Sequence, residues 1–186
     1  PESYFGYAWW TQAMTSPDLV RQRVATALTE IFVIGTTVEE IGENPIALAT
    51  YYDLLLNNSF GNFKDLLLDV TMSPAMGVYL SHLGNARANS DKGTFPDENY
   101  AREVMQLFSI GLFELNLDGS HKLDNSGNPI PTYDNNTIRE FAKVFTGLGN
   151  GGEEPSFQNE LERDVDFSIP MSMYEPYHDN TSKQLL

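Results

Sequence analysis

The stretch that decides the fold runs from Pro96 to Gly111 and reads PDENYAREVMQLFSIG. A proline followed by two acidic residues is typical of the first turn of a helix. At about 100° per residue, the side chains that follow divide into two faces. The polar face carries Glu98, Asn99, Arg102, Glu103 and Gln106, and the apolar face carries Tyr100, Val104, Met105, Leu107 and Phe108. The stretch therefore predicts an amphipathic helix with one buried face.

A second stretch, residues 139–146, resembles residues 102–109 without a gap. Both begin with Arg-Glu, and both carry Phe at the seventh position and a hydroxyl residue at the eighth. Two units are too few to establish a repeat architecture. The likeness favours two helices that lie side by side.

Four further helices are predicted before Pro96, three of them with a local start signal. Ser16-Pro17-Asp18 and Asn44-Pro45 both place a capping residue before a proline, and Ser73-Pro74 does the same. The apolar spacing that follows predicts helices over about 17–35, 45–56, 63–72 and 74–83.

Beyond Gly111 the apolar period shortens, since Leu115, Leu117 and Leu123 alternate with polar residues around Asp118-Gly119. An Asp-Gly pair between such runs is a strong hairpin signal. Asp134 to Thr137 predict the cap of a sixth helix that ends at Gly147, with Glu140 in a capping-box position relative to Thr137. Residues 150–176 predict a long irregular loop with one short strand around 167–169.

These elements predict a mainly α protein: a multi-helix domain with a small β-hairpin inserted between the fifth and sixth helices. At 186 residues, the chain has the length of a single domain. The first residue is Pro1 and the last two are apolar, so we expect residues 1–186 to be the middle part of a larger protein.

Composition excludes several classes of function. The formal net charge of −15 would repel nucleic acid and anionic membrane surfaces, and no apolar run is long enough to insert into a membrane. The chain has no cysteine, which excludes disulfides, thiolate catalysis and Cys-ligated metals. Phosphate-binding, dinucleotide-binding and nucleophile-elbow motifs are also absent from the sequence.

The polar face of the 96–111 helix supplies the candidate catalytic residues. Glu98, Asn99, Arg102 and Glu103 can line a polar site with His178, in which a carboxylate acts as a base and Arg102 orients an anion. The same spacing is equally that of a solvated face with an i,i+4 ion pair between Glu98 and Arg102.

Metal binding has two alternatives. His178, Asp179 and Glu103 could together hold a divalent metal ion, although no HExxH spacing is present. The oxygen-rich segment from Asp118 to Asn128 could hold calcium, but it lacks the order of ligands of an EF-hand, and turn chemistry also explains it.

Aromatic residues crowd the first ten positions, where Tyr4, Phe5, Tyr7, Trp9 and Trp10 lie. A stacking platform for sugars and an ordinary packing or interface patch are both consistent with them.

Several motifs resemble a bacterial family called domain of unknown function 1800. The most specific is the run from Pro96 to Glu103, and the others are Arg21 to Val24, Glu43 to Asp53, Asn62 to Leu67, Ser73 to Met76, Tyr133-Asp134 with Arg139-Glu140, Phe145 to Gly147, and His178-Asp179 with Lys183. The resemblance covers nearly the whole chain.

The resemblance implies a longer, exported protein, periplasmic or extracellular, without an established activity. Two functions remain open. The first is a non-catalytic surface or extracellular module that binds a protein partner or a polymer. The second is a metal-assisted hydrolase that uses Glu98 or Glu103 with His178 and Asp179.

Overall fold

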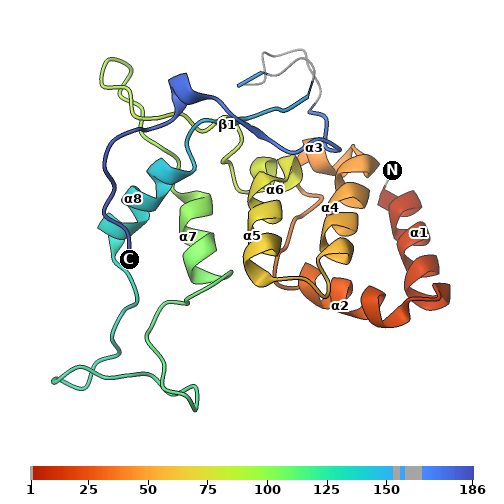
Figure 1. The fold of residues 1–186 in the computed structure, drawn as a ribbon, viewed down its shortest axis with the longest axis horizontal. Helices are drawn as coiled ribbons and strands as arrows, with labels where there is room; N and C mark the ends of the chain where they lie inside the picture. The colour runs from red at the N-terminus through yellow and green to blue at the C-terminus, as the bar shows by residue number, and fades with distance from the viewer. Residues whose placement is uncertain (1, 153–155, 158–164) are drawn as a thin grey trace. The chain divides into compact units, whose positions relative to one another are not determined.

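A computed structural model describes residues 2–152, 156–157 and 165–186 (Figure 1). The chain divides into two compact units. Unit 1 comprises Pro1–Gly84 and Leu148–Tyr174, and unit 2 comprises Asn85–Gly147 and Glu175–Leu186.

Unit 1 is a helical bundle centred on α4 (Pro45–Asn57). Around α4 pack α1 (Glu2–Thr15), α2 (Leu19–Thr29), α3 (Glu39–Gly42), α5 (Phe63–Met72) and α6 (Pro74–Tyr79). Phe32, Ile41 and Leu55 are fully buried in this core. The Tyr51 hydroxyl donates a hydrogen bond to the carbonyl of Phe32 at 2.8 Å, so its burial leaves no unsatisfied donor.

Local capping sets the start of two helices of unit 1. The side chain of Asn44 accepts a hydrogen bond from the N–H of Ile46, and Pro45 occupies the first turn of α4. Asn62 accepts a hydrogen bond from the N–H of Lys64 at 2.8 Å and begins α5. These side chains satisfy N–H groups that have no partner inside the helix. The predicted helices at these positions are confirmed.

Replacing Asn62 by Ala is expected to destabilise unit 1 by about 1 kcal/mol, because the N–H of Lys64 loses its acceptor. Urea unfolding followed by fluorescence measures this loss, since both tryptophans, Trp9 and Trp10, lie on α1 of the same unit. Asn62→Ser is the control and should retain most of the stability. Equal losses in the two variants would contradict the capping role.

In unit 1, two helices were not predicted, and two end earlier than predicted. Neither α1 nor α3 carries a start signal of the Asn-Pro kind. The helix predicted over 17–35 is α2, which begins after Asp18 and ends at Thr29. The helix predicted over 74–83 is α6, which ends at Tyr79 because Ser81 adopts a left-handed conformation with φ of 61°. The helix predicted over 96–111 in unit 2 is also shorter, since α7 comprises only Asn99–Gln106.

The short sheet of unit 1 pairs β1 (Leu148–Gly149) with β2 (Ser172–Met173) in antiparallel fashion. The strand predicted around 167–169 is wrong. Asp166 accepts hydrogen bonds from both the N–H and the hydroxyl of Ser168, and its carbonyl accepts one from Ile169, which bends these residues into a turn. Residues 153–155 and 158–164 of the predicted 150–176 loop lie outside the described residues.

Unit 2 is built on two helices that lie side by side, α7 (Asn99–Gln106) and α8 (Asn135–Val144). Tyr100 on α7 meets the ring of Phe145 edge to face, with centroids 4.8 Å apart. The pairing inferred from the two similar stretches is confirmed. A short 3₁₀ helix, Glu175–Tyr177, joins this unit from the C-terminal part of the chain.

The segment between α7 and α8 forms antiparallel bridges, of which Leu115 with His121 and Leu123 with Pro129 are two. Gly119 has a positive φ of 83° in the turn after Asp118, as the Asp-Gly signal requires. The hairpin turn lies where it was predicted, although the pairing consists of isolated bridges. The mainly α fold class is confirmed, and none of the helices in the described residues is long and apolar enough to cross a membrane.

Candidate functional site

Two hydrogen bonds between a pair of loop residues of unit 2 position the start of α7. Asn85 accepts a hydrogen bond from the N–H of Asp97 at 2.8 Å and donates one to the carbonyl of Asp97 at 3.2 Å. The Asp97 carboxylate in turn accepts from the N–H of Asn99 at 2.8 Å. This chain of bonds fixes Glu98 at the first turn of α7.

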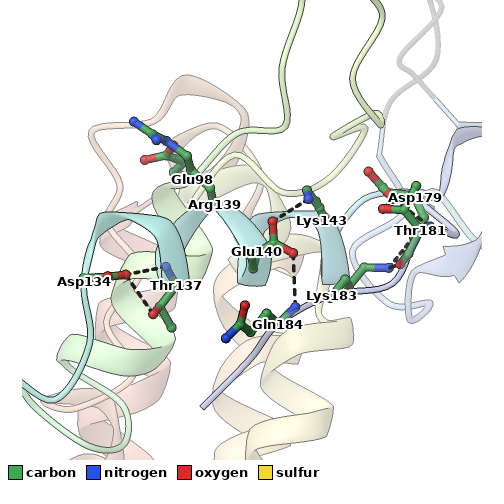
Figure 2. A network of polar contacts seen from close by, with 10 residues as sticks. All are labelled: Glu98, Asp134, Thr137, Arg139, Glu140, Lys143, Asp179, Thr181, Lys183 and Gln184. Atoms are coloured by element: carbon green, nitrogen blue, oxygen red, sulfur yellow. Dashed lines mark hydrogen bonds and ion pairs between the residues drawn. The ribbon is translucent and has the colours of Figure 1, made fainter.

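Glu98 lies between two arginines. One carboxylate oxygen is 3.2 Å from Nη2 of Arg102, and the other is 3.7 Å from Nε of Arg139 on α8. The side chain of Arg139 is 68% exposed, so much of its guanidinium stays available to a ligand (Figure 2). The predicted i,i+4 pair of Glu98 and Arg102 is confirmed, while Arg139 was not predicted as its second partner.

Asp134 is the N-cap of α8, and its carboxylate accepts from the N–H and the hydroxyl of Thr137 at 2.8 and 3.0 Å. The hydrogen bond from the Thr137 N–H, followed by that from the hydroxyl, lowers the pKa of Asp134. The cap predicted between Asp134 and Thr137 is confirmed at Asp134. The capping-box role of Glu140 is wrong, because Thr137 lies inside the helix and is not its N-cap. Glu140 is thereby free to bond elsewhere.

Glu140 connects α8 with the C-terminal segment. One oxygen accepts from Nζ of Lys143 at 2.5 Å, and the other accepts from the N–H of Gln184 at 3.2 Å (Figure 2). The Lys143 bond, followed by the Gln184 bond, holds the pKa of Glu140 below its ordinary value. Glu140 is therefore ionised at neutral pH.

Thr146 brings His178 and Asp179 to the end of α8. Nδ1 of His178 lies 2.7 Å from the Thr146 carbonyl, which makes it a donor, and the Thr146 hydroxyl oxygen accepts from the N–H of Asp179 at 2.9 Å. The Asp179 carboxylate accepts from the N–H and the hydroxyl of Thr181, and the ammonium of Lys183 donates to the carbonyl of Asp179. His178 and Asp179 thus help to secure the C-terminal segment.

Asp179 is buried and yet ionised. Burial raises the pKa of this carboxyl, but the bonds from Thr181 and the charges of Lys183 and Lys143 outweigh burial and bring the pKa below its ordinary value. A carboxyl held in this way does not retain a proton at neutral pH.

A cleft of about 550 Å³ opens beside Glu98 and Arg139. Its walls include Phe95, Pro96, Glu98, Arg139, Glu140 and Lys143. Phe95 is 81% exposed, so an apolar ring stands next to charged groups that already pair with one another. We take this cleft as the candidate site.

Glu103 lies apart from these ion pairs. Its Oε2 atom is buried and has no hydrogen-bond partner among the described residues, and the same holds for the hydroxyl of Tyr133. Burial, with the nearby charge of Glu103, raises the pKa of Tyr133.

No three His, Asp or Glu side chains of the described residues come together in a way that could hold a metal ion. The predicted trio of Glu103, His178 and Asp179 forms no such group. A calcium site between Asp118 and Asn128, which would combine two carboxylates with Asn and Ser oxygens, stays a prediction. In that segment Asp118 accepts from Ser120, while Asp124 accepts from the N–H groups of Ser126 and Asn128. A catalytic role for Glu98, Asn99, Arg102, Glu103 or His178 stays a prediction.

Sequence reasoning missed Phe95, Arg139, Glu140 and Lys143 as parts of one site. Arg139 and Glu140 were noted as a repeat of Arg102 and Glu103 and as a motif of the resembling family, but not as site residues. That likeness was the available signal, because two adjacent amphipathic helices of the same pattern can bring their polar faces to one place.

Fold and site together define a mainly α-helical protein with an ion-paired cleft beside an exposed aromatic ring. Residues 3–186 match the family model described as Protein of unknown function (DUF1800), and the chain belongs to this family. No curated protein and no solved structure matches the chain.

Proposed function

We propose that this protein is a non-catalytic binding module and that the cleft of unit 2 binds a polymer of neutral sugars. The observation that carries the proposal is the exposed ring of Phe95 beside a cleft whose acidic and basic side chains form ion pairs with one another. A flat apolar ring packs well against the C–H face of a sugar. The proposal includes an exported location, which rests on the family resemblance.

The pairing of charges in the cleft favours a neutral ligand. Glu98 is paired with Arg139, and Glu140 is paired with Lys143, so the ligand has no charge to neutralise. The formal charge of −15 also disfavours acidic polymers. Sugar hydroxyls can both donate to a carboxylate and accept from a guanidinium, which suits the polar groups present.

The ionisation of Glu140 and Asp179 makes these two carboxylates unsuited to the role of general acid. A general acid that works at neutral pH needs a raised pKa, whereas the pKa values of Glu140 and Asp179 are lowered. These two groups therefore hold no proton to donate.

In affinity electrophoresis, hydroxyethyl cellulose, xylan or dextran in the gel is expected to retard the protein. Phe95→Ala should weaken binding about tenfold, corresponding to roughly 1.4 kcal/mol of lost ring contact. Arg139→Ala should also weaken it, through lost hydrogen bonds. Tyr7→Ala is the matched control, because Tyr7 is an exposed aromatic residue of α1 and lies in unit 1.

Equal retardation of Phe95→Ala and Tyr7→Ala, or no retardation by any of the three polymers, would contradict the proposal. Elemental analysis before and after chelation tests the rival hydrolase. A stoichiometric metal that disappears in His178→Ala would favour that rival over the binding module.

A further inference from the structure

A second cavity, open to the surface and lined only by residues of unit 1, has a volume of about 720 Å³. This volume is within the range of small-molecule sites. Helices α4 and α5 supply most of its lining residues, and the rest are Asn58, Ser73, Pro74, Phe167, Ser168 and Pro170. Nothing in the proposed sugar cleft involves these residues.

The wall formed by residues 167–170 is held to the helices by two hydrogen bonds. The Thr50 hydroxyl on α4 donates to the carbonyl of Phe167 at 3.0 Å, and the N–H of Met171 donates to the carbonyl of Met72 at 2.8 Å. Phe167 is itself buried. The cavity is therefore built by bonds that connect distant parts of the chain.

Two carboxylates and several apolar side chains line this cavity. Asp53 on α4 and Asp69 on α5 are the acids, and no Lys, Arg or His stands among the described lining residues. Asp69 is oriented by Asn58, whose Nδ2 donates to its Oδ2 at 2.8 Å. Leu54, Leu68, Met72 and Pro170 add apolar surface beside the acids.

Charge and shape together select the ligand. Within the described chain neither Asp53 nor Asp69 forms an ion pair, so a bound cation would find two carboxylates with free lone pairs. The apolar walls suit an alkyl chain, and three or more metal-binding side chains do not gather among the described residues here.

We infer that this cavity binds an alkylammonium group, in which the ammonium faces Asp53 and Asp69 and the methylenes lie against the apolar walls. Such a group ends both a free diamine and a lysine side chain. The site is independent of the sugar cleft.

Isothermal titration with 1,5-diaminopentane tests the site. Asp53→Asn and Asp69→Asn should each weaken binding by about fivefold or more, since each removes one charge from the cation's surroundings. Leu68→Ala should weaken 1,5-diaminopentane more than 1,2-diaminoethane, because only the longer chain reaches the apolar wall. Melting curves verify that each variant is folded.

Asp91→Asn is the control, because Asp91 is an exposed loop residue of unit 2 and its replacement changes the net charge by the same amount. If Asp91→Asn weakens binding as much as Asp53→Asn does, the ligand is attracted by the acidity of the whole protein. That result would overturn the proposal. Undiminished binding in both cavity variants, or equally tight binding of uncharged 1-pentanol, would also overturn it.

A comparison of two ligands identifies the source of the ammonium group. Tighter binding of 1,5-diaminopentane than of N-acetyl-lysine-methylamide indicates a free diamine, and the reverse indicates a lysine side chain of a peptide. Either order supports the site, whereas failure of both ligands to bind would overturn it.

Discussion

Tyr100→Ala is expected to destabilise unit 2 by about 3–5 kcal/mol, the usual cost of removing a large aromatic ring from a core. The Tyr100 side chain is 1% exposed and lies on the apolar face of α7. Its ring meets Phe145 at 4.8 Å and Phe108 at 6.3 Å between centroids. Removing it takes away the ring contacts that join α7 to the end of α8.

Hydrogen exchange in peptides from α7 and α8 measures this loss, because unit 2 contains no tryptophan. The free energy of opening should fall in both helices. Phe95→Ala removes a ring of similar size from a side chain that is 81% exposed, and its effect on stability should be small. A Tyr100→Ala loss below about 1 kcal/mol, close to that of Phe95→Ala, would show that the ring does not support the core.

The helices that sequence reasoning located best are those whose start depends only on adjacent residues. Asn44 before Pro45 caps α4 through a bond from the N–H of Ile46, two positions later, so the signal and its effect lie within one turn. Helix α1 has no such signal, and aromatic residues occur on both its buried and exposed sides. Trp9 packs against Tyr52, whereas Tyr4 and Tyr7 are exposed.

The candidate site could be predicted only where its contacts are local. The pair of Glu98 and Arg102 follows from i,i+4 spacing on one helix. The pair of Glu98 and Arg139 joins two helices, and the bonds of Thr146 to His178 and Asp179 span more than thirty residues. Such contacts depend on tertiary packing, which no periodicity within one segment encodes.

The cavity of unit 1 could not be predicted from the sequence for the same reason, because its walls also meet through tertiary packing. Thr50 and Phe167 are 117 residues apart, and no pattern in either segment indicates that they meet. The sequence did suggest that a long irregular segment was present, and long ordered loops often serve a function. Its role as a wall of the cavity became visible only with the structure.

Acidification from pH 6.5 to pH 4 is expected to destabilise unit 1 through His82. This side chain is 1% exposed, and its Nε2 lies 2.9 Å from the carbonyl of Thr71, to which it donates. Burial lowers the pKa of His82 from 6.5 to about 4, against the opposing effect of the Thr71 bond. The folded state therefore keeps the imidazole neutral where the unfolded chain binds a proton.

Above pH 6.5 the histidine is neutral in both states, so its protonation does not change the stability. Between pH 6.5 and 4 the unfolded state binds more protons, and the free energy of unfolding should fall by up to about 1.4 kcal/mol per pH unit. The total loss is roughly 3 kcal/mol, and it is complete below the folded-state pKa of about 4. Asp166, also in unit 1, has a lowered pKa, so its contribution is lost mainly below this window.

Urea unfolding followed by the fluorescence of Trp9 and Trp10 at several pH values measures the effect, because both tryptophans and His82 belong to unit 1. His82→Gln keeps a donor that can reach the Thr71 carbonyl but cannot titrate. This variant should be less stable than the wild type at pH 7 and should lose much less stability on acidification. Parallel stability curves for the two proteins between pH 6.5 and 4 would mean that the loss comes from other groups, since a buried neutral imidazole must resist protonation.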